Sequence, residues 1–147
     1  MVVKTGGEAV VEAMVAEGID LVFGNPGDHV LDIYNALRDV RRIRHILVNH
    51  EGTASFMAEA FGRLTGKPGV CVVTAGPGAT NSATGVAQGL VSSSPMVHIS
   101  GAVPRETRGE DIHALPDPRA LARFFEPITK RSIYVETVED IPEALAK

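Results

Sequence analysis

Three segments of this sequence combine acidic, amide and glycine residues in ways that could bind a ligand or do chemistry. The first, Val48-Asn49-His50-Glu51, ends on a carboxylate that directly precedes a stretch of small and apolar residues. A carboxylate at the start of a helix is stabilised by the helix macrodipole by about 0.3–1 kcal/mol, and periodicity alone favours this capping interpretation of Glu51. In a partly apolar cleft, desolvation would instead raise the pKa of Glu51 and let it exchange a proton with a ligand.

The second segment is Thr74-Ala75-Gly76-Pro77-Gly78-Ala79-Thr80-Asn81. It is either a tight turn from strand to helix or a glycine loop at a helix N-terminus that is open to an anion or a flat polar ring. It is not a Walker loop, because no Gly-Lys-Ser/Thr follows. Asn81 stands where the dinucleotide fingerprint has its third glycine, and Pro77 lacks the N–H of a phosphate cradle. These departures argue against pyrophosphate at this loop.

The third segment, Gly24-Asn25-Pro26-Gly27-Asp28-His29, has the composition of a turn. Asp28 could cap the helix that follows or face a ligand, and local sequence favours the cap. The 5 histidines show no metal-ligand spacing, so we predict no metal site. The single cysteine, Cys71, lies in an apolar run and is interpreted as a core residue.

Hydrophobic periodicity predicts the elements that must position these segments. Short apolar runs predict strands at residues 19–23, 44–48, 69–74, 95–100 and 128–135. Amphipathic stretches predict helices between Thr5 and Gly18, at 30–37, 52–65 and 77–91, and after a capping box at 137–140. This order predicts an α/β fold with a parallel sheet flanked by helices on both faces. Because ligands bind beyond the carboxyl ends of such strands, the three segments should meet there.

Composition and charge exclude several classes of protein. With 147 residues, the chain has room for one compact domain. A formal net charge of -4 argues against a grip on the phosphate backbone of nucleic acid. No apolar run approaches the roughly 18–20 residues of a membrane span. One cysteine cannot form an internal disulfide, which favours a reducing, cytoplasmic compartment.

Together, the three segments resemble the pyrimidine-binding domain of thiamine-diphosphate enzymes, in the group of acetolactate synthases and 2-oxo acid decarboxylases. The matching residues are Gly24-Asn25-Pro26-Gly27, His50-Glu51 with Met57-Ala58-Glu59, and the segment 74–81. The stretch Pro127-Ile128-Thr129-Lys130-Arg131-Ser132 is similar to the acetolactate synthase pattern as well. The resemblance covers nearly the whole chain in order, and it replaces the capping interpretation of Glu51 with a catalytic one.

The resemblance implies a proton-exchanging role for Glu51. Its carboxyl group would hydrogen-bond N1′ of the aminopyrimidine and share a proton with it, which activates the cofactor to attack the carbonyl group of a 2-oxo acid such as pyruvate. After carbon dioxide leaves, the enamine would release an aldehyde or be ligated to a second carbonyl. Acetolactate synthases have a glutamine directly after the glutamate, where this chain has Gly52, so both outcomes stay open.

Other site residues follow from the same resemblance. Asp28 and His113 match catalytic residues of pyruvate decarboxylases. The positions implied to contact the cofactor, besides Glu51, are Pro26, Gly27, Thr74, Pro77 and Asn81.

The resemblance also implies further domains and partners. Family members bind the diphosphate and Mg²⁺ through a separate domain with a Gly-Asp-Gly motif, which this sequence lacks. We therefore expect residues 1–147 to be a single pyrimidine-binding domain that is inactive alone. It is expected to be a fragment of a larger chain that also has central and diphosphate-binding domains, or else one subunit of a split enzyme. Its expected partners are a diphosphate-binding domain or subunit, a homo-oligomer and a small 2-oxo acid, while FAD binding is left open. The alternatives are a non-catalytic thiamine-diphosphate-binding regulatory subunit and a generic nucleotide-binding domain.

Overall fold

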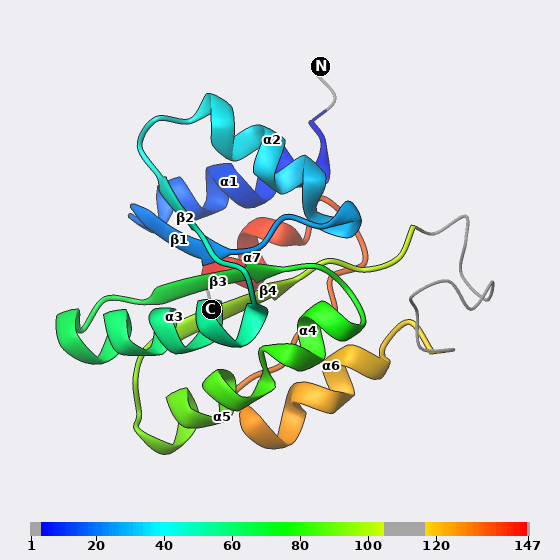
Figure 1. Cartoon of the computed structure of the whole chain (residues 1–147). Coiled ribbons are helices and arrows are strands. Elements are labelled where there is room, and N and C mark those ends of the chain that lie inside the picture. Colours follow the sequence, from blue (N-terminus) through cyan, green and yellow to red (C-terminus); the bar gives the residue numbers. More distant parts are fainter. Residues whose placement is uncertain (1–3, 105–116, 147) are drawn as a thin grey trace.

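The structure is a computed structural model that describes residues 4–104 and 117–146. Its centre is a four-stranded sheet in the order β2-β1-β3-β4, in which all neighbouring strands are parallel (Figure 1). The strands are β1 (Leu21–Gly24), β2 (Arg44–Leu47), β3 (Gly69–Val73) and β4 (Met96–Ser100). This sheet confirms the predicted fold class.

Helices cover both faces of the sheet (Figure 1). One face carries α1 (Gly6–Ala16), α2 (Leu31–Asp39) and α7 (Ile141–Ala146). The other carries α3 (Glu51–Thr65), α4 (Pro77–Asn81), α5 (Ala83–Val91) and α6 (Ala120–Phe125). Alternate side chains of a strand point to opposite faces of the sheet, so a strand can contribute side chains to the hydrophobic core on each face. Val22, Val70 and Val72 pack with α1 and α2, whereas Phe23, Cys71 and Val73 pack with α3, α5 and α6.

The predicted start of α1 and the predicted end of α3 are confirmed. The Thr5 hydroxyl accepts a hydrogen bond from the backbone N–H of Glu8 at 3.2 Å, and the Glu8 carboxylate accepts one from the backbone N–H of Thr5 at 2.8 Å. This reciprocal pair is a capping box. Gly66 ends α3 at a φ of 71°, a left-handed conformation that glycine adopts without the strain of a Cβ.

Cys71 lies in the core, as predicted, with none of its surface exposed. Burial, together with the charge of Glu51, raises the pKa of its thiol to about 12. The thiol therefore stays protonated and unreactive at neutral pH.

The predicted single helix over residues 77–91 is wrong, because α4 ends at Asn81 and α5 begins at Ala83. Ser82 stands at the break. Its hydroxyl donates a hydrogen bond to the Ala79 carbonyl at 2.6 Å and lies 2.7 Å from Nε2 of His98. A serine hydroxyl that bonds a nearby backbone carbonyl competes with the regular helix, and this accounts for the interruption.

The C-terminal region also departs from the prediction. The strand predicted at residues 128–135 is wrong: Glu126–Ile128 is a 3-10 turn, and residues 129–136 form neither helix nor strand. Ile133 and Val135 are 43% and 37% exposed, so their alternation does not mark a buried face. Helix α7 begins at Ile141, after Asp140, whose carboxylate accepts a hydrogen bond from the Thr137 hydroxyl at 2.6 Å.

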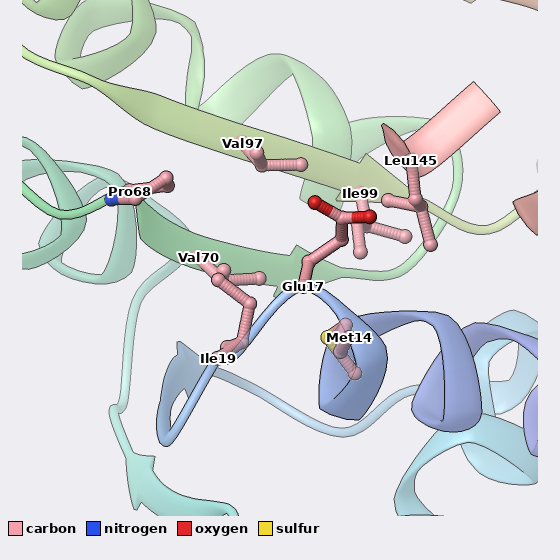
Figure 2. A pocket seen from close by; sticks show the side chains of 8 residues that line it. All are labelled: Met14, Glu17, Ile19, Pro68, Val70, Val97, Ile99 and Leu145. Carbon is pink, nitrogen blue, oxygen red and sulfur yellow. The ribbon is translucent and has the colours of Figure 1, made fainter. Parts of the chain in front are cut away.

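A small apolar cavity of about 80 Å³ lies between α1, β3, β4 and α7. Figure 2 shows the carboxylate of Glu17 beside the apolar side chains of Ile99 and Leu145. Two further lining residues, Ile19 and Pro68, lie just before β1 and β3. The cavity thus lies on the face of the sheet that carries α1 and α7, and none of the three predicted segments lines it.

Candidate functional site

The three predicted segments leave the carboxyl ends of adjacent parallel strands. They follow β1, β2 and β3, which end at Gly24, Leu47 and Val73. From β1 the sheet continues to β2 on one side, and from β3 it continues to β4 on the other. The gap between β1 and β3 is therefore the topological switch point, where α/β sheets bind their ligands.

Glu51 is the first residue of α3, but its side chain does not cap the helix. The cap is His50, whose Nδ1 accepts a hydrogen bond from the backbone N–H of Gly52 at 3.0 Å. The Glu51 carboxylate instead accepts hydrogen bonds from side-chain amides, from Asn81 at 3.1 Å and from Asn25 at 3.5 Å. The acid thus joins the segment after β1 to the end of α4.

The direction predicted for the pKa of Glu51 is wrong for this chain. Partial burial does raise the pKa, as expected. Hydrogen bonds from Asn81, from the backbone N–H of Glu51 and from Asn25 outweigh the burial and lower the pKa below its usual value. Glu51 is therefore a carboxylate at neutral pH.

Thr74 lies between two glycines, one from each turn. A Cβ on Gly27 would approach Cβ of Thr74 to 2.6 Å, and a Cβ on Gly78 would approach Cγ2 of Thr74 to 2.6 Å. The Gly78 position also faces Glu51, since a Cβ there would lie 3.5 Å from Oε1. Glycine at both positions therefore lets the two turns close on Thr74 and leaves space beside the carboxylate.

The other predicted site residues lie at the same edge of the sheet. Pro26 and Pro77 are exposed, and Pro77 is the first residue of α4. Asp28 is exposed and opens a 3-10 turn, Asp28–Val30. It does not cap α2, because the N-cap of α2 is Val30, which makes no side-chain cap hydrogen bond. His113 lies outside the residues that the structure describes.

Sequence reasoning did not single out two polar side chains at this edge. One is Asn25, which donates to Glu51, and the other is His29, whose Nδ1 lies 3.2 Å from Oγ1 of Thr74. Their position directly after β1 could have identified them as site residues, because polar residues after one strand face those after its neighbour.

Within residues 4–104 and 117–146, no group of three or more His, Cys, Asp or Glu side chains could hold a metal ion. In the same ranges, no helix has both the length and the apolar character to cross a membrane.

An acid and two amides at the switch point of a parallel sheet define the binding edge of an α/β ligand-binding domain. The sequence matches, over residues 4–122, the family described as thiamine pyrophosphate enzyme, N-terminal TPP binding domain. The chain belongs to this family. The match confirms the resemblance found in the sequence, and the family's name agrees with the predicted cofactor, thiamine diphosphate.

Several relatives match almost the whole chain. The acetolactate synthase large subunit of Buchnera aphidicola subsp. Acyrthosiphon pisum is 46% identical over 147 residues, which are 100% of this chain and 25% of the relative. The acetolactate synthase isozyme 3 large subunit of Escherichia coli K12 is 44% identical, with the same coverage. The acetolactate synthase of Bacillus subtilis is 44% identical over 99% of this chain and 25% of its own length. The chain thus spans about a quarter of the length of these relatives.

Proposed function

We propose that this chain is the pyrimidine-binding domain of a thiamine-diphosphate-dependent enzyme that decarboxylates a 2-oxo acid such as pyruvate. The names of the relatives favour ligation of the remaining carbon unit to a second carbonyl over release of an aldehyde. The observation that carries the proposal is the Glu51 carboxylate at the switch point, where it accepts hydrogen bonds from Asn25 and Asn81.

The residues at this edge fit an aminopyrimidine ring. Gly78 leaves space beside Oε1 of Glu51, and the hydrogen bond from Asn25 to this oxygen is long, at 3.5 Å. A half-buried carboxyl oxygen with weak bonding is a suitable partner for a ring nitrogen. The residues proposed to surround the ring are Pro26, Gly27, Thr74, Pro77 and Asn81.

The proposed chemistry divides between cofactor and protein. When bound, thiamine diphosphate supplies a nucleophilic carbon and then accepts the electron pair that carbon dioxide leaves behind. Glu51 holds and moves a proton at N1′ of the pyrimidine. Partial burial already acts to raise the pKa of Glu51, and covering the site would strengthen that effect. The pKa would then rise toward the range in which the carboxyl group exchanges protons at neutral pH.

We propose a further catalytic role for Asp28, which is exposed at the same edge, and for His113. Binding of the diphosphate and Mg²⁺ is assigned to a separate domain or subunit. Because the relatives are about four times longer than this chain, that domain is expected to be part of the complete enzyme.

The proposal is tested in the enzyme assembled with its diphosphate-binding domain. Glu51→Gln keeps the size of the side chain but removes its acid–base exchange, so the rate of carbon dioxide release from pyruvate should fall by about 10²–10⁴-fold. Glu12→Gln is the matched control, because Glu12 is exposed on α1 and pairs with Lys4. Full activity in the Glu51→Gln enzyme would disprove the proposed role.

A further inference from the structure

We propose that Glu59 is a positioning residue that sets the register of α3 against α5 and thereby holds Glu51 against Asn81. This inference rests on the proposed function, since it takes Glu51 to be the proton-exchanging group. Its evidence is a second polar contact of α3, made to the residues that follow α5 and far from the sheet edge.

Glu59 is a buried acid whose partners come from the end of α5. It lies on α3, about 12 Å along the axis from Glu51 at 1.5 Å per residue, and its side chain is 6% exposed. The Ser94 hydroxyl donates a hydrogen bond to Oε1 of Glu59 at 2.7 Å, and the Ser92 hydroxyl lies 2.8 Å from the same oxygen. Arg63 is more distant, with its Nε at 3.9 Å. These serine contacts lower the pKa of Glu59, so the buried group is charged.

The two polar contacts lie before and after α5, and on α3 they involve its first residue and a residue near its middle. Helices α3 and α5 pack side by side on the same face of the sheet (Figure 1). Both helices run away from the edge at which the strands end. At the near end, Asn81 precedes α5 and donates to Glu51. At the far end, Ser92 is the C-cap of α5 and contacts Glu59.

Between these contacts the helices meet through small residues. A Cβ on Gly85 would lie 2.3 Å from Oγ of Ser55, so the helices touch almost backbone to backbone. Ser55, the residue of α3 that faces Gly85, has no exposed surface. Small side chains allow close approach but interlock weakly, so they restrain sliding along the helix axis less than large side chains would.

The charge on Glu59 supplies the missing restraint. Sliding α3 along α5 would draw the carboxylate away from both hydroxyls, and a buried charge without hydrogen bonds is strongly unfavourable. The Asn81–Glu51 hydrogen bond is 3.1 Å long. A slide of about 1 Å can carry it beyond hydrogen-bond distance. The contact at Glu59 therefore protects the geometry at Glu51.

The test measures the pKa of Glu51 by ¹³C NMR of its carboxyl carbon in the chain without cofactor. Glu59→Gln should raise this pKa, because the helices slip and the hydrogen bond from Asn81 weakens. Loss of a negative charge at Glu59, acting through space alone, would lower the pKa of Glu51, so the sign separates the two effects. Ser94→Ala, which keeps the charge, should also raise it.

Glu12→Gln on α1 is the control and should leave the pKa of Glu51 unchanged. Urea denaturation of each variant shows that it is folded, and if Glu59→Gln does not fold, Ser94→Ala decides alone. An unchanged or lowered pKa of Glu51 would overturn the inference and leave Glu59 with a role in stability only. The measurement needs no turnover, so a result against the role of Glu59 is distinct from a result against the proposed function. The latter would be full activity of the Glu51→Gln enzyme.

Discussion

Glu51 shares its two carboxylate oxygens between amides that come from two different segments, Asn25 after β1 and Asn81 at the end of α4. Neither amide carries a charge, so they hold the acid in place without forming an ion pair that would keep it deprotonated. The hydrogen bond from Asn81 is the shorter of the two. At the scale of single residues, the site is thus an acid oriented by neutral donors.

Removing the shorter of these hydrogen bonds should change the acid directly. We expect Asn81→Ala to raise the pKa of Glu51, because the hydrogen bond from Asn81 is the largest of the effects that lower it. The measurement is a pH titration of the Glu51 carboxyl carbon by NMR. Asn35→Ala is the matched control, since Asn35 is exposed on α2. Equal titration curves for the wild type and Asn81→Ala would show that the amide does not tune the acid.

His98 gives a prediction for stability against pH. Burial lowers the pKa of His98 from 6.5 to about 4. Between these values the unfolded chain binds a proton that the folded chain does not, so the free energy of unfolding falls as the pH falls through this window. From pH 7 to pH 5 the loss should be about 2 kcal/mol. His98→Gln should remove this part of the loss, as measured by urea denaturation at both values. An undiminished loss in the variant would contradict the prediction.

At the scale of elements, the start of α3 meets Asn81 at the end of α4, and Gly85 sets the spacing between α3 and α5. A Cβ there would lie 2.7 Å from the backbone nitrogen of Phe56. Although alanine favours a helix over glycine by about 0.5–1 kcal/mol, Gly85→Ala should lower the free energy of unfolding by about 1–3 kcal/mol through overpacking. Urea denaturation measures the change. Thr84→Ala, an exposed neighbour on α5, should stay within about 0.5 kcal/mol of the wild type.

The elements show which features could be predicted from the sequence. Capping by Thr5 and termination at Gly66 are local, and both were predicted correctly. The placement of the three segments at one edge followed from the alternation of strands and helices, which fixes the direction of every strand. Periodicity alone thus sufficed to place Glu51 beside the turns after β1 and β3.

The features that the sequence did not predict depend on tertiary contacts. The break at Ser82 involves His98, which lies on a strand distant in sequence. The lowered pKa of Glu51 depends on Asn81, which is 30 positions away. The strand wrongly predicted at residues 128–135 has a suitable apolar pattern, but its apolar side chains are partly exposed. Strand formation depends on burial against neighbours, which the pattern cannot report.

At the scale of the whole molecule, the site lies at an open edge. Leu47, at the carboxyl end of β2, is 64% exposed. An exposed apolar side chain at the rim of a binding edge agrees with the proposal that another domain completes the site. The length of the relatives supports the same proposal.

This arrangement predicts how the isolated chain distinguishes forms of the cofactor. Among the described residues that we propose to surround the ring, none is a lysine or an arginine. Glu51 is negative, and Pro77 lacks an N–H. A diphosphate group should therefore gain little here, and thiamine and thiamine diphosphate should bind the chain with affinities that differ by less than about tenfold, or about 1.4 kcal/mol. Isothermal titration calorimetry with each compound measures the difference. With the diphosphate-binding domain and Mg²⁺ present, thiamine diphosphate should bind much more tightly than thiamine. Strong preference for the diphosphate form by the chain alone would instead place an anion site within these 147 residues.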